Sequence, residues 1–226
     1  MQMVFQDSYA SLNPRLTIEE SIAFGPKVHG MADGVARALA RELLGKVGLR
    51  PETFANRYPH ELSGGQRQRV NIARALALSP RLVLLDEAVS ALDKSVEAQV
   101  LNLLIDLKEE FGLTYVFISH DLHVVRFISD RVIVMYLGEV VETGPVDALW
   151  SDARHPYTRA LLAAVPDPDL DHRLDFAALM EGKASNPAAW PGAFRIAGEE
   201  KPGMLHLGRG HYVRARDSAN ASEVAA

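Results

Sequence analysis

Two short stretches of the chain are apolar at almost every position, and a longer stretch between them is apolar at helical spacing. Residues 82–86 read LVLLD and residues 114–119 read TYVFIS, which is typical of strands buried on both faces of a parallel sheet. Residues 94–111 repeat apolar side chains at helical spacing, and Gly112 follows as a helix-ending residue. The order strand–helix–strand therefore predicts an α/β fold, in which the two strands share one parallel sheet and the helix packs across it.

Other elements are predicted from shorter patterns. Thr17 is an expected helix N-cap because two glutamates follow in the first turn. Two ranges predict helices with one apolar face, namely 31–48 (Val35, Leu39, Leu43, Leu44, Val47) and 66–78 (Val70, Ala73, Leu76, Ala77). The sequence also predicts the end of a strand at 2–5, a short helix at 121–127, a hairpin around Gly138 at 131–142, a polar hinge at 166–175 (PDPDLDHRLD) and a flexible tail at 200–226.

The composition is that of a globular protein, with 48% hydrophobic and 23% charged residues. The net charge of −5 gives no reason to expect bulk binding to nucleic acid. Because the chain has no cysteine, disulfides, thiolate metal sites and iron–sulfur clusters are excluded. No apolar run approaches the roughly 18 residues of a membrane span. We therefore expect any connection with a membrane to be made through a partner.

Polar residues follow the two predicted strands, at Asp86, Glu87 and His120. In open α/β sheets, ligands bind at the carboxyl ends of parallel strands. An Asp-Glu pair in this place suits a P-loop nucleoside triphosphatase, where the Asp orients Mg²⁺ and the Glu orients or deprotonates the attacking water. The same carboxylates could instead cap the next turn, and a lone histidine after a strand is often a structural residue. These residues by themselves leave both interpretations open.

The sequence ELSGGQ at 61–66 stands immediately before an arginine-containing helix. Backbone N–H groups of the paired glycines, followed by a helix N-terminus, can form an anion site. The same glycines could equally form a flexible loop. Gln6 carries no information on its own.

Five motifs in a fixed order decide between these interpretations. They are VFQD at 4–7, LSGGQ at 62–66, LLDEA at 84–88, SALD at 90–93 and ISHD at 118–121. Over residues 1–165 the chain resembles the nucleotide-binding subunit of ABC transporters, from its Q-loop to its switch histidine. The segments SYASLNPRLTIEESI, LDEAVSALDKSVEAQVLNLL and HPYTRALLAAVPDPD resemble the ATPases of bacterial dipeptide and oligopeptide importers, a subfamily also used for nickel. This implies a P-loop NTPase-like core with a helical subdomain at about 15–78, followed by a partly flexible C-terminal extension at 166–226.

The resemblance also implies a role for each motif. In this family two nucleotide-binding domains close head to tail on two ATP molecules. By analogy, Glu87 would be the catalytic base, Asp86 would orient Mg²⁺, and His120 would contact the γ-phosphate. Gln6 would reach the metal and the attacking water, and would report their state to the transmembrane partner.

The signature loop would serve a different nucleotide. By the same analogy, Asp93 in the SALD turn would communicate across the dimer. An ATP molecule held by the partner subunit would be contacted by Ser63, Gly64, Gly65 and Gln66.

The implied partners are a second ABC ATPase subunit, identical or related, and transmembrane permease subunits. An extracytoplasmic solute-binding protein would act indirectly, and no nucleic acid is expected. The expected location is the cytoplasmic face of the bacterial inner membrane. Peptides are the expected solutes, although the ATPase subunit does not contact the solute itself.

Two alternatives remain. Soluble ABC ATPases of DNA repair or translation share the signature and Asp-Glu motifs, but usually carry long inserted arms or a second cassette. Here only residues 67–83 separate LSGGQ from LLDEA, and no coiled-coil heptads appear, which disfavours this class. The second alternative is a non-hydrolysing ABC module that only lends its signature loop to a partner.

The pattern GxxxxGK[ST] does not occur in the 226 residues. In ABC ATPases this phosphate-binding loop precedes the Q-loop, as does the aromatic residue that stacks on adenine. We therefore expect an N-terminally incomplete ATPase that binds ATP weakly and hydrolyses it negligibly by itself. We also expect its central sheet to expose apolar surface.

Overall fold

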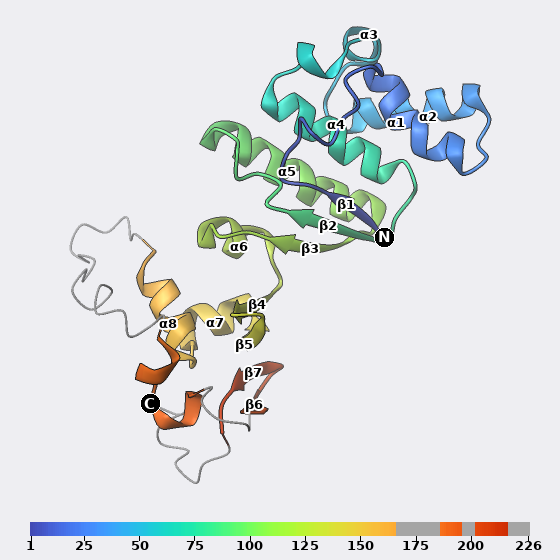
Figure 1. Ribbon diagram of the computed structural model, residues 1–226. Coiled ribbons are helices and arrows are strands. Elements are labelled where there is room, and N and C mark those ends of the chain that lie inside the picture. Colours follow the sequence, from blue (N-terminus) through green and yellow to red (C-terminus); the bar gives the residue numbers. More distant parts are fainter. Residues whose placement is uncertain (166–185, 196–201, 217–226) are drawn as a thin grey trace. The chain divides into compact units, whose positions relative to one another are not determined.

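The computed structural model describes residues 1–165, 186–195 and 202–216 (Figure 1). The chain divides into two compact units, residues 1–124 and 125–226, and the division falls within helix α6 (Leu122–Ile128). Among the described residues, no helix is long and apolar enough to cross a membrane. The predicted boundary at residue 165 between an ATPase domain and an extension stays a prediction.

The first unit contains a parallel three-stranded sheet in the order β1-β2-β3. Its strands are β1 (Gln2–Val4), β2 (Leu82–Asp86) and β3 (Thr114–Ile118), and helix α5 (Lys94–Phe111) connects β2 to β3. The Tyr115 hydroxyl on β3 donates a hydrogen bond to the Leu104 carbonyl of α5 at 2.9 Å. Gly112 ends α5 with a φ of 60°, as a left-handed C-cap. The predicted α/β fold with a parallel sheet is confirmed.

Four helices gather beside this sheet (Figure 1). They are α1 (Ile18–Val28), α2 (Asp33–Lys46), the short α3 (Pro51–Phe54) and α4 (Gly64–Leu76), with a 3₁₀ turn at Pro59–Glu61 before α4. Thr17 caps α1 as predicted, because its side chain accepts from the Glu20 amide while Glu20 reaches back to the Thr17 amide. The apolar face predicted for α4 is buried as expected.

The face of α2 that is buried differs from the predicted one at the start of the helix. Val35 is 58% exposed, whereas Ala36 and Ala40 are buried together with Leu43 and Leu44. Small alanine side chains allow α2 to approach its neighbours closely, so the buried stripe follows the alanines rather than the first valine.

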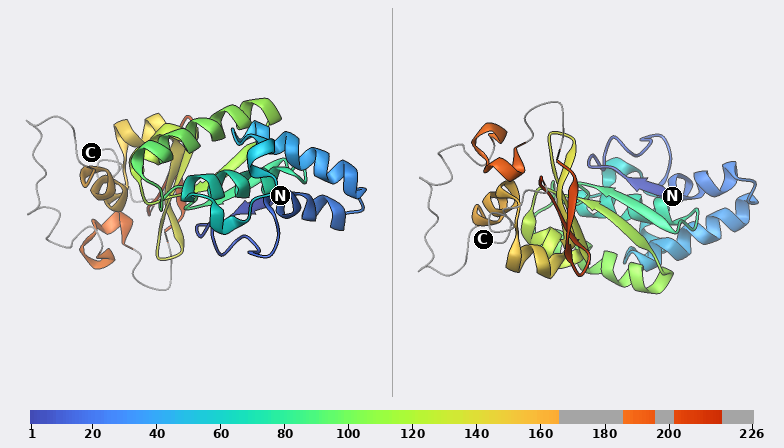
Figure 2. Two further views of the ribbon diagram at one scale, coloured as in Figure 1. Left: turned by 90° about the horizontal axis from the view of Figure 1, so that it is seen from above. Right: turned by 90° about the horizontal axis from the view of Figure 1, so that it is seen from below.

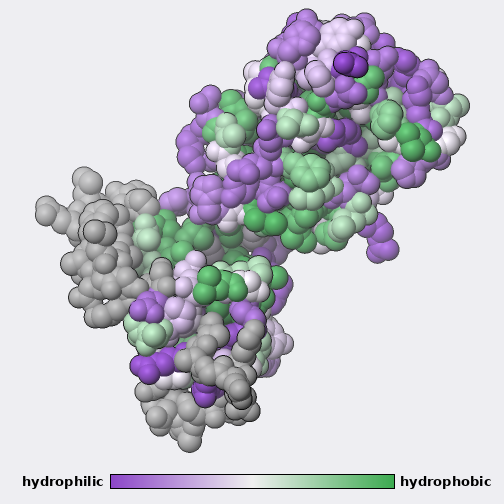
Figure 3. Space-filling view, in the orientation of Figure 1, coloured by the Kyte–Doolittle hydropathy of each residue, from purple (hydrophilic) through white to green (hydrophobic). Residues whose placement is uncertain are grey.

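The prediction that residues 114–119 are buried on both faces was wrong. Val116 and Ile118 of β3 are each 46% exposed, whereas Val83 and Leu85 of β2 are buried. β2 lies between two neighbours, but β3 lies at the edge of the three-stranded sheet and pairs only with β2. The expected exposure of apolar surface is thus observed on β3. In Figure 3, hydrophobic residues gather along the edge of the first unit where Figure 1 draws the sheet.

The second unit is built on an antiparallel sheet in the order β4-β5-β7-β6. Strands β4 (Arg131–Tyr136) and β5 (Glu139–Pro145) form the predicted hairpin around Gly138, and helices α7 (Val146–Asp152) and α8 (Pro156–Ala163) follow. Two 3₁₀ turns, at Pro187–Ala189 and Gly192–Phe194, precede strands β6 (Met204–Gly208) and β7 (His211–Arg214). Figure 2 shows this second hairpin in two further views.

The prediction of a flexible tail was therefore wrong for residues 204–214. Gly208 pairs with His211, and the two turn residues Arg209 and Gly210 have φ values of 50° and 74°. Two residues with positive φ make the tight turn whose twist matches an antiparallel hairpin. The predicted hinge at 166–175 lies outside the described residues.

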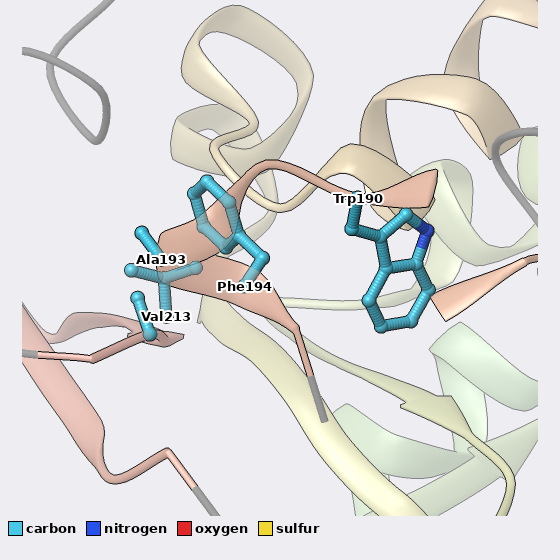
Figure 4. Close-up of a cluster of buried hydrophobic side chains, with 5 residues drawn as sticks. Trp190, Ala193, Phe194 and Val213 are labelled. Atoms are coloured by element: carbon cyan, nitrogen blue, oxygen red, sulfur yellow. The ribbon is translucent and has the colours of Figure 1, made fainter. Parts of the chain in front are cut away.

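The core of the second unit forms around aromatic side chains. Trp190, Ala193, Phe194, Val213 and Ala215 are buried together (Figure 4). The buried His155 ring lies at right angles to the Trp190 ring, with centroids 4.7 Å apart. The fully buried Glu142 carboxylate accepts from the Arg154 amide at 2.8 Å, the His155 amide at 3.0 Å and His211 Nε2 at 2.8 Å.

Candidate active site

Parallel pairing brings side chains from three strand ends to one edge of the first unit's sheet. Asp86 is the last residue of β2, and Glu87 follows it. His120 comes two residues after β3, and Gln6 comes two residues after β1. Because all three strands run in the same direction, their carboxyl ends meet at the same edge.

The Glu87 carboxylate is the centre of this group. Gln6 donates from Nε2 to Glu87 Oε2 at 2.6 Å, and His120 Nδ1 lies 3.1 Å from Glu87 Oε1. Both carboxylate oxygens are therefore engaged by side chains that the sequence separates by more than 30 residues. The structure thus brings together the three residues named from the sequence as the hydrolytic group.

Glu87 has an unusual backbone conformation, with a φ of 45°. A residue other than glycine rarely adopts the left-handed region, which is unfavourable by roughly 1–2 kcal/mol. Its amide donates to the Ile118 carbonyl at 3.0 Å, and its carbonyl accepts from the Ser90 amide at 3.1 Å and hydroxyl at 3.0 Å. Such strain, held in place by surrounding bonds, concentrates at functional sites. No feature of the sequence signals it.

Asp86 lies at the same edge, half-buried. Within the described part of the chain its side chain makes no hydrogen bond or ion pair, so both carboxylate oxygens are available to a cation. Hard cations such as Mg²⁺ prefer carboxylate and amide oxygens, and Mg²⁺ keeps several waters or substrate oxygens as further ligands. Among the described residues, no three His, Asp or Glu side chains form a metal site of their own. The set Asp86, Glu87 and Gln6 fits a hydrated Mg²⁺ ion that also needs ligands from a substrate.

The SGGQ sequence forms the start of helix α4 and not a flexible loop. Ser63 is the N-cap, and its Oγ accepts from the Gln66 amide at 3.3 Å, while Gln66 Oε1 accepts from the Ser63 amide at 3.0 Å. Gly64 and Gly65 occupy the first two helical positions, where amides have no partner within the helix. Amides of this kind, at the positive end of the helix dipole, favour an anion.

The SALD turn lies against this helix start. Leu92 Cδ2 is 3.7 Å from the place of a β-carbon on Gly64, and Val96 contacts the backbone at Gly65. Asp93 is the exposed N-cap of α5, and its side chain does not cap the helix. The residues assigned to the partner's nucleotide thus form a second group. In the described residues, no hydrogen bond or ion pair joins that group to Glu87.

Lys94 and Asp121 form a connection that the sequence analysis missed. Lys94 Nζ lies 2.8 Å from Asp121 Oδ2, and the other Asp121 oxygen accepts from the His123 amide at 2.9 Å. The hydrogen bond from Lys94 lowers the pKa of Asp121. This pair ties the residue after the SALD turn to the residue after His120. Opposite charges 27 positions apart give no sequence signal of contact.

The fold and the arrangement of these groups define the chain as an ABC-type ATP-binding cassette. Residues 1–90 match the family model described as ABC transporter, and residues 141–192 match the model described as oligopeptide/dipeptide transporter, C-terminal region. The chain belongs to the ABC transporter family, as the motif order indicated.

Two individual relatives are similar to this chain over most of its length. The oligopeptide transport ATP-binding protein OppF of Bacillus subtilis is 55% identical over 174 residues, which are 76% of this chain and 57% of that protein. The glutathione import ATP-binding protein GsiA of Escherichia coli is 49% identical over 224 residues, which are 98% of this chain and 35% of that protein. The chain thus spans about half the length of the first relative and about a third of the second.

Solved structures agree with the fold. A dimeric structure of MJ0796, a bacterial ABC transporter cassette, is 39% identical and has a TM-score of 0.56, over 65% of this chain and 62% of that one. A dimeric post-hydrolysis state of the same cassette, bound to ADP and Pi, has a TM-score of 0.54 at 38% identity, over 64% and 63% of the two chains.

Proposed function

We propose that this chain provides the hydrolytic group of an ATPase subunit that energises a bacterial ABC importer of peptides. The observation that carries the proposal is the convergence of Gln6 and His120 on the Glu87 carboxylate, at the edge where the parallel strands end. Phosphoryl transfer needs positioning and charge stabilisation more than covalent chemistry, and such polar side chains can supply both.

Each residue takes one role in this proposal. Glu87 accepts a proton from, or orients, the attacking water, and its two hydrogen bonds hold the carboxylate in one direction. His120 contacts Glu87 through Nδ1, which leaves Nε2 for a phosphate oxygen. Asp86 would hold Mg²⁺ through its water shell, and Gln6 would offer its amide oxygen to the same ion. Bound Mg·ATP supplies the phosphoryl group and neutralises part of its charge.

The helix start at Ser63, Gly64, Gly65 and Gln66 would bind the phosphates of an ATP held by a second ABC ATPase subunit. The assignment to a different nucleotide is supported by two observations: the first amides of the helix have no partner within it, and no hydrogen bond or ion pair in the described residues joins this group to Glu87. Asp93, exposed beside it, would communicate between the two sites. The second subunit is a copy of this chain or a related one, and the cassette structures it resembles are described as dimeric.

The remaining partners follow from the proposed importer function. Transmembrane permease subunits would bind the cassette at the cytoplasmic face of the bacterial inner membrane, and a solute-binding protein outside would deliver the solute. Peptides are the proposed solute class because the model matched by residues 141–192 and two relatives carry peptide or glutathione transport in their descriptions. No observation favours the repair, translation or non-hydrolysing alternatives.

The test uses a complete version of the subunit, which carries a phosphate-binding GxxxxGK[ST] loop, isolated with its native partners. The variant Glu87→Gln keeps the size and the hydrogen-bonding reach of the side chain but removes the base. We expect ATP turnover to fall by about 100-fold or more while ATP stays bound. Glu109→Gln, on the exposed side of α5, makes the same chemical change away from the site and should leave turnover unchanged. Equal turnover in the wild type and Glu87→Gln would remove Glu87 from the catalytic role.

A further inference from the structure

One face of helix α4 holds the segment 7–12, which follows Gln6 directly. Asn71 donates from Nδ2 to the Ser8 carbonyl at 3.0 Å. Arg74, one turn further along α4, donates from Nη1 to the Ser11 carbonyl. Both donors reach backbone carbonyls that lie 63 positions earlier in the chain.

A third side chain on the same face reaches the same segment. The Arg67 guanidinium lies over the Tyr9 ring, with 5.4 Å between the guanidinium carbon and the ring centroid. Residues 67, 71 and 74 are spaced by four and three positions, so they share one helix face. We call these three residues the α4 clamp.

The segment held by the clamp is an ordered turn. The Asp7 Oδ1 atom accepts from the Tyr9 and Ala10 amides, each at 2.9 Å, and the Asp7 carbonyl accepts from the Ser11 amide at 3.2 Å. Because this turn begins at the residue after Gln6, its position determines where the Gln6 side chain can reach.

Packing alone does not explain Asn71. The residue is only 2% exposed, and its Oδ1 atom has no hydrogen-bond partner in the described structure. A buried amide with an unsatisfied oxygen is unfavourable compared with an apolar side chain of the same shape. The bond from Nδ2 to Ser8 is the one polar contact that this side chain makes within the described residues, and it fixes the turn.

We infer that Asn71 and Arg74 are positioning residues, which keep Gln6 on Glu87 by fixing the segment 7–12 to α4. The consequence for hydrolysis rests on the proposed function. Ser63 is the N-cap of α4, so the helix whose start would face the partner's ATP also sets Gln6 in the chain's own site.

The clamp is tested by amide hydrogen exchange on the full chain, followed in a peptide that covers residues 4–13. Asn71→Leu and Arg74→Met each remove one donor and keep the approximate side-chain size, and each should speed exchange in the segment by about tenfold or more. Arg74→Lys keeps a donor and should restore slow exchange. Arg69→Met is the matched control, because Arg69 lies on the same helix and donates to a different carbonyl, that of Val47 at 2.9 Å.

The positioning role needs a second readout at the site itself. We expect the NMR signals of the His120 ring to shift in Arg74→Met in the same direction as in Gln6→Ala. The double variant should show no further shift. Faster exchange with unchanged His120 signals would overturn the inference, because the clamp would then be structural only. Unchanged exchange in both Asn71→Leu and Arg74→Met, or equal effects in Arg69→Met, would also overturn it. No nucleotide is involved, so these outcomes are independent of the ATPase proposal.

Discussion

Gly65 lies so close to Val96 that a β-carbon at position 65 would come within 2.4 Å of the Val96 Cγ1 atom. The backbone at the start of α4 therefore packs directly against the Val96 side chain at the start of α5. Only glycine fits at position 65 without a shift of Val96. Gly65→Ala should lower the free energy of unfolding by about 1–3 kcal/mol, the usual effect of overpacking a filled contact. Urea denaturation followed by circular dichroism measures this change.

Gly64 provides the matched control for this prediction. A β-carbon at position 64 would be 3.7 Å from Leu92 Cδ2, an ordinary contact. Gly64→Ala should therefore have little effect, and Val96→Ala should partly rescue Gly65→Ala by removing the clashing methyl groups. Equal loss in Gly64→Ala and Gly65→Ala would show that the close contact is not the cause.

The buried Glu142 carboxylate should be essential for the stability of the second unit. It accepts from two backbone amides and from His211, with no exposure to water. In Glu142→Gln an amide NH₂ group faces these donors, so we expect a loss of about 2–4 kcal/mol. Trp150 and Trp190, the two tryptophans of the chain, both lie in the second unit, so fluorescence during urea unfolding reports on it. Glu139→Gln is the control, because Glu139 lies on the same strand with a partly exposed side chain. It should lower the free energy of unfolding far less.

His155 should make the stability of the second unit depend on pH. Burial lowers the pKa of His155 to about 4, compared with about 6.5 for an ordinary histidine. Between pH 6.5 and 4 the unfolded chain binds a proton at this ring and the folded chain does not, so acid favours unfolding. We expect the free energy of unfolding to fall by on the order of 3 kcal/mol across this window.

Replacement of His155 by asparagine isolates this effect. The ring now accepts from the Tyr157 amide at 3.1 Å as the N-cap of α8, and asparagine can also cap but does not titrate. His155→Asn should be less stable at pH 7. Its free energy of unfolding should fall less between pH 6.5 and 4 than that of the wild type. His206→Asn, at an exposed ring in the same unit, should keep the wild-type slope. A wild-type slope in His155→Asn would contradict the assignment.

The 226-residue chain should bind ATP weakly when it is alone. Its sequence has no GxxxxGK[ST] loop, whose amides and lysine normally cradle the β- and γ-phosphates. The carboxylates Asp86 and Glu87 do not replace that cradle, because they repel phosphate unless a cation lies between. Titration with a fluorescent ATP analogue measures the affinity, and a micromolar dissociation constant would refute the prediction.

The elements of the site could largely be predicted from the sequence. Strand β2 is apolar up to Asp86 and buries Val83 and Leu85, and Thr17 and Ser63 cap helices because local side-chain chemistry suffices to start them. The order strand–helix–strand predicts parallel pairing, and the carboxyl ends of parallel strands meet at one edge of the sheet. This is why Glu87 and His120 could be expected to lie together. The exposed face of β3 was missed because its burial depends on which strands and helices cover it, and an apolar run carries no such information.

The sequence by itself determined the family, the parallel sheet and the residues that gather at its edge, because motif order and hydrophobic periodicity are local properties of the chain. Only the tertiary structure decided the strained backbone of Glu87, the contact of Gly65 with Val96, the α4 clamp on residues 7–12 and the hairpin at 204–214. Each of these depends on groups that are distant in sequence or on a positive φ. Such contacts arise from how packed elements meet, which periodicity does not encode.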